Sequence, residues 1–147
     1  MNLFGLMEVS GSALKAERIR AEVVAANMAN AETTRTPEGG PYRRQHVVFS
    51  SAAAEPTTFA GQLLSQSEPQ MGGVAVSAVV QDPTSTLRRF DPAHPDADKD
   101  GYVSYPDINP LTEMVDLMGA TRAYGLNSSA IQATKGMINS SLDILKS

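Results

Sequence analysis

The sequence contains no cysteine and no tryptophan, and only 5% of its residues are aromatic. The absence of cysteine excludes disulfide bonds, thiolate metal sites and cysteine nucleophiles. Much of the 41% apolar content is alanine and valine, which bury little area each, so a large single core is not assured. We expect the 147 residues to form one modest domain, or a small domain that carries long helical ends.

Positive charge is also scarce. The sequence has 12 Lys and Arg residues and 16 Asp and Glu residues, which gives a net charge of −4. This balance argues against a nucleic-acid partner or an anionic membrane surface. Apolar runs are only a few residues long, so we expect no direct membrane insertion. The amino-terminal stretch has neither the basic start nor the apolar segment of a cleavable signal peptide. Any passage out of the cytoplasm is therefore expected to use another route.

Catalytic and cofactor-binding patterns are missing as well. The two histidines, His46 and His94, lie far apart in the sequence, which does not favour a histidine zinc site. Neither belongs to a nucleophile motif, and the glycine pairs at 39–40 and 72–73 lack the spacing of a phosphate-binding loop. We therefore expect no enzymatic activity and no cofactor.

The first 35 residues indicate a long helix, over about residues 2–31, followed by a short motif. Proline is absent before residue 37, and good helix formers dominate. Apolar and small residues recur every seven positions and form a narrow stripe, with Val24 beside it. The residues of this row that we expect to pack against another helix are Met7, Leu14 and Met28.

Residues 109–147 indicate a second long helix with an unbroken seven-residue apolar repeat, which is typical of coiled-coil-like packing. Pro110 suits its first turn, and Glu113 favours its amino-terminal end. The repeat consists of Leu117, Tyr124, Ile131, Ile138 and Leu145.

The middle zone, residues 36–108, holds eight of the nine prolines and six of the eleven glycines. Alternating and β-branched residues predict short strands at 46–50, 74–81, 86–90 and 101–105. Residues 51–73 indicate a loop or mobile insertion. The expected fold class is α+β, in which long N- and C-terminal helices form a coiled-coil-like hairpin with a small inserted β domain.

Each helix stripe is too narrow to be buried alone, and isolated helices are marginal without tertiary packing. Two interpretations remain open. The helices order only on contact with each other and with neighbouring copies, or they form an ordinary antiparallel hairpin within the monomer.

The segment Asp96–Asp107 has the spacing of an EF-hand loop, with acids at loop positions 1, 3 and 5 and Gly101 at position 6. A small calcium-binding module is therefore an alternative function. Against it, the last position is a short Asp107, and Pro106 blocks helix entry. A tight turn that feeds a strand is the other interpretation.

Two basic pairs flank the predicted strands, at Arg43–Arg44 and Arg88–Arg89. We interpret them as solvated edge residues that discourage aggregation between strands. A role against acidic partner surfaces is the alternative.

The segment Ala26-Asn27-Met28-Ala29-Asn30, followed by Thr33 and Thr34, is similar to the ANxxAN motif of bacterial flagellar axial proteins. Further segments resemble the FlgC family of flagellar basal-body rod proteins, in the right order and over nearly the whole chain. They include Pro41-Tyr42-Arg43-Arg44, Asp91-Pro92-Ala93-His94-Pro95 and Arg122-Ala123-Tyr124.

The resemblance implies a structural subunit of the proximal rod, located in the periplasmic part of the basal body, that assembles helically with other rod subunits and with copies of itself. It implies type III export in an unfolded state. Independently of it, the small residues Ala26 and Ala29 would let helices approach closely. Asn27, Asn30 and Thr33 complete the expected assembly motif, whose asparagines can cap the helix or bond a neighbour's backbone. A soluble helical adaptor with a single partner helix remains a third alternative.

Overall fold

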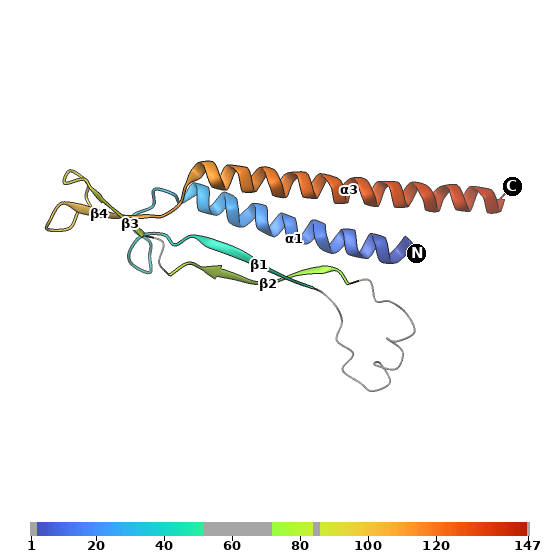
Figure 1. The fold of residues 1–147 in the computed structure, drawn as a ribbon, viewed down its shortest axis with the longest axis horizontal. Helices are drawn as coiled ribbons and strands as arrows, with labels where there is room; N and C mark the ends of the chain where they lie inside the picture. Colours follow the sequence, from blue (N-terminus) through green and yellow to red (C-terminus); the bar gives the residue numbers. More distant parts are fainter. Residues whose placement is uncertain (1–2, 52–71, 84–85, 147) are drawn as a thin grey trace, which may run out of the picture. The chain divides into compact units, whose positions relative to one another are not determined.

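A computed structural model describes residues 3–51, 72–83 and 86–146 of the chain (Figure 1). The helices and strands follow the order α1 (Leu3–Ala29), β1 (Gln45–Ser51), β2 (Val74–Gln81), β3 (Thr86–Phe90), β4 (Tyr102–Pro106) and α3 (Pro110–Lys146). The predicted α+β class, with a long helix at each end and a sheet region between them, is confirmed. Most of the loop predicted at 51–73 lies outside the described residues, because 52–71 are among those not described.

The four strands form two separate ribbons, one of β1 with β2 and one of β3 with β4. The β3–β4 ribbon is antiparallel, with a register that runs from Thr86 opposite Pro106 to Phe90 opposite Tyr102. A two-stranded ribbon alone is only marginally stable in water. Each ribbon therefore depends on packing against the residues around it.

The chain divides into two compact units, and each takes residues from both helices. Unit 1 comprises Met1–Arg18, Phe49–Ser77 and Thr121–Ser147. Among its described residues, the most buried side chains are small or polar: Ser10, Ala16 and Thr134. Ser12 joins α1 to the first residue of β2, because the Val74 backbone N–H donates to the Ser12 Oγ at 3.0 Å.

Unit 2 comprises Ile19–Val48 and Ala78–Ala120. Its apolar core is contributed by the end of α1, by β4 and the residues after it, and by the start of α3. The buried apolar residues there are Val24, Val103, Ile108 and Ala120. Asn27 and Glu113 are buried beside them, at 1% exposure each. A core this small agrees with the low aromatic content of the sequence.

The start of α3 is defined by capping. The Leu111 backbone N–H donates to the Asn109 Oδ1 at 3.0 Å, which satisfies one of the free donors at the helix end. Pro110 is the first helical residue, where its missing N–H costs nothing. The loop from β4 therefore ends at Asn109, and Glu113 lies just inside the helix.

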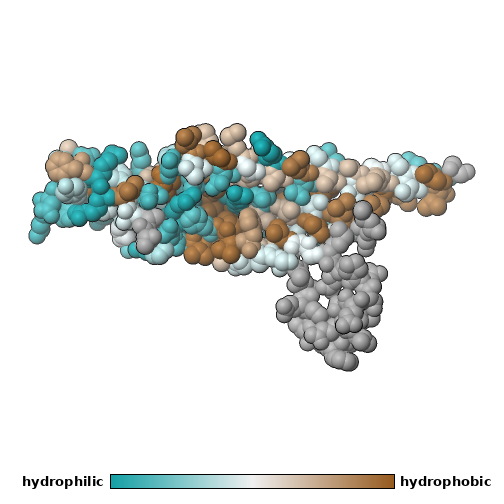
Figure 2. Space-filling model, in the orientation of Figure 1, coloured by the Kyte–Doolittle hydropathy of each residue, from teal (hydrophilic) through white to brown (hydrophobic). Residues whose placement is uncertain are grey.

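The most buried row of α3 is polar and small rather than apolar. Glu113, Ala120 and Thr134 are all at 1% exposure or less, and they lie at multiples of seven residues. Thr134 donates its hydroxyl to the Ala130 carbonyl at 2.8 Å, so its polar group is satisfied on its own helix. Large apolar residues lie on other faces of α3, and Figure 2 shows apolar side chains at the surface along this helix. No described helix is long and apolar enough to cross a membrane.

Candidate assembly site at the end of the first helix

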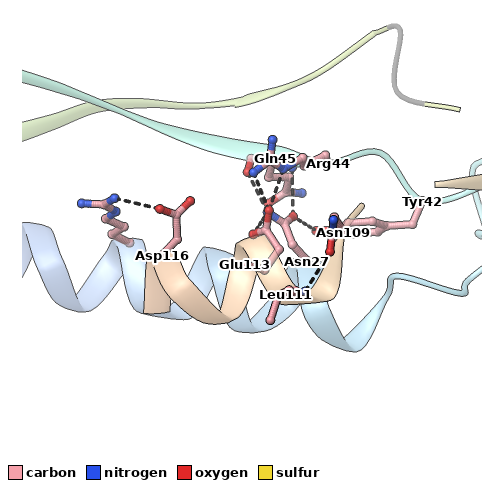
Figure 3. A network of polar contacts seen from close by, with 9 residues as sticks. Asn27, Tyr42, Arg44, Gln45, Asn109, Leu111, Glu113 and Asp116 are labelled. Atoms are coloured by element: carbon pink, nitrogen blue, oxygen red, sulfur yellow. Dashed lines mark hydrogen bonds and ion pairs between the residues drawn. The ribbon is translucent and has the colours of Figure 1, made fainter. Parts of the chain in front are cut away.

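Asn27, near the end of α1, uses its full hydrogen-bonding capacity inside unit 2 (Figure 3). Its Nδ2 donates to the Gln45 carbonyl at 2.9 Å and to the Glu113 Oε2 at 3.1 Å. Its Oδ1 accepts from the Gln45 backbone N–H at 2.9 Å and from the Tyr42 hydroxyl at 3.2 Å. An amide side chain has two donors and two acceptor lone pairs, so all four are satisfied. Asn27 therefore joins α1 to the first residue of β1 and to α3.

Glu113 brings a buried carboxylate into the same network. Its Oε1 accepts from the Arg44 Nε at 2.7 Å, and a second guanidinium nitrogen of Arg44 pairs with the same oxygen. The Arg44 side chain is 26% exposed, whereas that of Glu113 is 1% exposed. A buried charge is tolerated only when it is paired and hydrogen-bonded, and here both carboxylate oxygens have donors. We call Asn27, Tyr42, Arg44, Gln45 and Glu113 the asparagine hub.

Tyr42 closes the hub on its loop side. Burial of the ring raises the pKa of the Tyr42 hydroxyl above its ordinary value of 10.0, and the negative charge of Glu113 raises it further. The neutral phenol is thus the form that the hub favours, and this form is the one that donates to Asn27. The Tyr42 backbone N–H also donates to the Thr33 carbonyl at 3.0 Å, which fixes the loop after α1.

Asn30 ends the helix. Its Nδ2 donates to the Ala26 carbonyl at 2.9 Å, and its Oδ1 accepts from the Thr33 hydroxyl at 3.1 Å. The Ala26 carbonyl thus accepts from both the backbone and the side chain of Asn30, and the Thr33 hydroxyl holds that side chain, so the bonds fix the carboxy-terminal end of α1. A hollow of about 550 Å³ lies beside this turn, with Asn30, Thr33, Tyr42 and Gln45 among its lining residues. The turn is therefore held by side-chain hydrogen bonds and lies beside an accessible hollow.

The first part of the acidic segment Asp96–Asp107 forms a tight turn, which leads into β4. Gly101 has φ 78°, and its N–H donates to the Asp98 carbonyl at 2.8 Å. The Asp96 carboxylate accepts from the Thr34 hydroxyl at 2.8 Å, and Asp98 pairs with Arg88. Within the described parts of the chain, no group of three or more His, Asp or Glu side chains could hold a metal ion. The tight-turn interpretation is confirmed, and no observation supports calcium binding.

Comparison with known proteins covers the chain from end to end. A family model described as "Flagella basal body rod protein" matches residues 7–35, and one described as "Flagellar basal body rod FlgEFG protein C-terminal" matches residues 99–144. The FlgC rod protein of Borreliella burgdorferi is 40% identical, over 99% of both chains. That of Bacillus subtilis is 41% identical, over 99% of this chain and all of its own length. That of Salmonella typhimurium is 35% identical over 98% of both.

This chain belongs to the FlgC family of flagellar basal-body rod proteins. The segment that matches the rod-protein model, residues 7–35, includes Asn27 and Asn30 of the hub and cap. The segment that matches the carboxy-terminal model, residues 99–144, includes Glu113. The asparagine hub thus joins the two matched segments inside unit 2.

The residues of the expected FlgC-family assembly motif are close together. Asn27 is buried, and Ala26, Asn30 and Thr33 are half-buried. Ala29 is exposed on the last turn of α1. Of the alternatives for the two asparagines, Asn30 caps the helix, and Asn27 bonds a backbone of its own chain. The assembly role of the motif stays a prediction.

The predicted helix-packing residues vary in exposure. Val24 is buried at 6%, while Tyr124 is 44% exposed and Leu145 is 81% exposed. The other predicted packing residues are half-buried: Met7, Leu14, Met28, Leu117, Ile131 and Ile138. A single chain therefore leaves much of the predicted α3 row uncovered. Whether copies of FlgC-family subunits cover it stays a prediction.

Four members of the hub were not predicted as site residues: Tyr42, Arg44, Gln45 and Glu113. The interpretation of Arg44 as a solvated edge residue was wrong, because its guanidinium pairs with the buried Glu113. Glu113 lies 69 positions after Arg44, so no local spacing signals the pair. The one available signal was the Tyr42–Arg44 segment within the resemblance to the FlgC family.

Proposed function

We propose that this chain is a non-catalytic structural subunit of the proximal flagellar rod, which assembles with other rod subunits and with copies of itself and transmits torque across the periplasm. The observation that carries the proposal is the asparagine hub. It joins the end of α1, the start of β1 and the start of α3 through buried bonds to Asn27 and Glu113. Such a junction holds two helices and a strand at one angle.

The load-transmitting contacts in this proposal are many and individually weak. Exposed apolar side chains remain along α3, including Val115 at 62% and Met118 at 60%. Contiguous exposed apolar surface marks sites of interaction with other proteins. Neighbouring subunits would cover these faces and the rows that contain Met7, Leu14 and Leu145. No single residue then carries the torque.

The rod motif serves assembly indirectly as well as directly. Asn27 and Asn30 fix the end of α1, and the exposed Ala29 gives a neighbouring helix room for close approach. Replacement of both asparagines with leucine should therefore leave export intact and reduce incorporation into the rod.

Export by the flagellar type III apparatus completes the proposal. The hub assembles residues from positions 27, 42–45 and 113, so it forms only after both ends of the chain have emerged. Weak helices and a small core are suited to passage in an unfolded state. The folded location is then the periplasmic rod of the basal body.

Deletion of the gene, scored for hook and filament assembly, tests the function. We expect no hook and no filament, with both restored by the wild-type gene on a plasmid. The Asn27→Leu/Asn30→Leu double variant should be secreted at the wild-type level but should not restore motility. Complete flagella in the deletion strain would overturn the rod assignment.

A matched control tests whether any change of a helical asparagine to leucine has the same effect. Asn127→Leu is the same substitution on α3, at a half-buried asparagine whose side chain donates to the Ala123 carbonyl of its own helix at 2.9 Å. We expect it to restore motility in the deletion strain. Equal failure of this control and of the double variant would contradict a special role for the motif.

A further inference from the structure

The β3–β4 ribbon presents one strand outward in unit 2. Val103 and Pro106 of β4 are buried and hold the ribbon to the unit. All five residues of β3 are exposed, including Leu87 at 54% and Phe90 at 62%. The side chains of β3 are therefore not there to fill the core of unit 2.

Each face of the ribbon carries one arginine above a tyrosine ring. The Arg88 guanidinium lies 5.0 Å from the centre of the Tyr102 ring, and the Arg89 guanidinium lies 4.5 Å from that of Tyr105. Neighbouring residues of a strand point to opposite faces, so the two cations are displayed on both sides. Stacking on a ring restricts the arginine side chain before any partner binds. It leaves the N–H groups at the edge of the guanidinium free to donate to a partner.

The two arginines differ in what else they meet. Arg88 pairs with Asp98 at 3.5 Å, and both side chains are more than half exposed, so this pair is weak. Arg89 has the Tyr105 ring as its partner, and Leu87 lies on the same face because it stands opposite Tyr105 in the register. A fixed guanidinium beside an exposed leucine forms a mixed basic and apolar surface.

We propose that this surface, formed by Leu87, Arg89 and Tyr105, docks an acidic segment of a neighbouring rod subunit. The planar guanidinium matches a carboxylate in bidentate geometry, and Leu87 meets an apolar side chain beside it. The partner argument rests on charge. A chain with net charge −4 repels polyanions at long range, whereas the face with Leu87, Arg89 and Tyr105 carries one cation and no acid of either strand. Isolated carboxylates on protein therefore fit better than nucleic acid or a lipid surface. The identity of the partner as a rod subunit rests on the proposed function.

Photo-crosslinking in cells tests the docking. Because Leu87 is exposed, p-benzoylphenylalanine is placed there in the full chain, in a strain that lacks the chromosomal gene. We expect an adduct with a peptide of a rod subunit that has Asp or Glu within a few residues of the crosslinked position. An adduct with an acid-free peptide, with nucleic acid or with lipid would overturn the proposal.

Charge reversal provides the quantitative arm. Arg89→Glu should lower the adduct yield roughly three- to tenfold, and Arg89→Lys should give an intermediate loss because it keeps the charge without the planar fork. Arg43→Glu is the matched control, since Arg43 is exposed in the same unit and changes the net charge equally. Equal yields in Arg89→Glu and Arg43→Glu would contradict a docking role for Arg89.

A compensating charge change in the partner distinguishes loss of the ion pair from misfolding of the Arg89→Glu variant. The acid found by mass spectrometry is replaced with lysine in the partner, and the yield with Arg89→Glu should return toward the wild-type value. No recovery would count against a direct ion pair. The gene-deletion experiment tests the proposed function separately. Complete flagella in the deletion strain would overturn the rod assignment, whereas a crosslink to a peptide rich in Asp or Glu would still support an acidic docking partner.

Discussion

The Asn27 side chain makes the same pair of hydrogen bonds to the Gln45 backbone that a neighbouring β-strand would make. The Asn27 side chain accepts from the Gln45 backbone N–H and donates to the Gln45 carbonyl, both at 2.9 Å. The end of α1 therefore serves as a hydrogen-bonding neighbour for the first residue of β1. An asparagine is needed there, because aspartate lacks the donor and leucine lacks both groups.

Asn27→Asp should destabilise the folded chain by about 2–4 kcal/mol. The change removes two donated bonds and sets a second negative charge beside the buried Glu113. Urea unfolding of the purified chain, followed by far-UV circular dichroism, gives the free energy of unfolding. Asn30→Asp is the control and should cost about 1 kcal/mol, because it weakens only the helix cap. Equal losses in the two variants would contradict the hub.

Glu113 and Arg44 should show strong energetic coupling. Glu113→Gln and Arg44→Met each leave a partner in a buried or half-buried site, so each single change should cost about 3 kcal/mol. The double variant leaves no unpaired charge and should cost less than the sum by at least about 1 kcal/mol. Urea unfolding of the four proteins completes the cycle. Additive losses would show that the pair contributes no coupling energy.

Stability should fall at high pH through Tyr42. Burial, and then the charge of Glu113, raise the pKa of its hydroxyl above 10.0 in the folded chain. A raised folded pKa means that the contribution is fully present below pH 10 and is lost as the pH rises through the folded value. Tyr42→Phe should flatten this decline between about pH 10 and 12, as measured by urea midpoints across pH. Tyr124→Phe, at an exposed site on α3, should leave the decline unchanged.

Gly101→Ala should destabilise the β3–β4 ribbon by about 1–2 kcal/mol. Gly101 has φ 78°, and an added Cβ would lie 2.9 Å from the Phe90 ring. Gly101→Asn tests the two causes separately, because asparagine tolerates this backbone conformation but still carries a Cβ. Amide hydrogen exchange of β3 and β4 measures the loss. Unchanged protection in Gly101→Ala would contradict a requirement for glycine.

Gly125→Ala and Gly136→Ala should each stabilise the isolated chain by up to about 1 kcal/mol. Both glycines lie inside α3, and an added Cβ meets nothing within 4 Å at either position. The helix signal in circular dichroism against temperature measures the gain. A destabilised monomer would contradict the open surroundings seen here. Loss of motility despite a more stable monomer would place these glycines against a neighbouring subunit.

The sequence was sufficient for the elements and insufficient for the hub. Helix formers, proline positions and alternation placed both helices and all four strands to within about two residues. These signals are local, because backbone preferences act over a few neighbours. The bonds between Asn27, Arg44 and Glu113 join positions far apart, and only the folded chain brings them together. Arg44 was consequently misread as solvated.

The heptad row of α3 illustrates a second limit. Its regular spacing correctly indicated a long helix, but the most buried row of α3 is that of Glu113, Ala120 and Thr134. Spacing does not say whether the chain itself or a neighbour covers the heptad row, and Leu145 is 81% exposed while Thr134, off that row, is fully buried. Small and polar residues pack closely only where the opposite helix permits it, which depends on tertiary structure.

The polar seam of unit 1 has a consequence for how its hydroxyl groups are satisfied. Thr134 bonds the Ala130 carbonyl of α3, and the Ser12 hydroxyl bonds the Val9 carbonyl of α1, so each helix brings its own partners with it. The Ser12 hydroxyl also accepts from the Val74 backbone N–H, so the same side chain serves both α1 and β2. The Thr134 and Ser12 hydroxyl donors are therefore satisfied within their own helices and do not have to find a partner on another element.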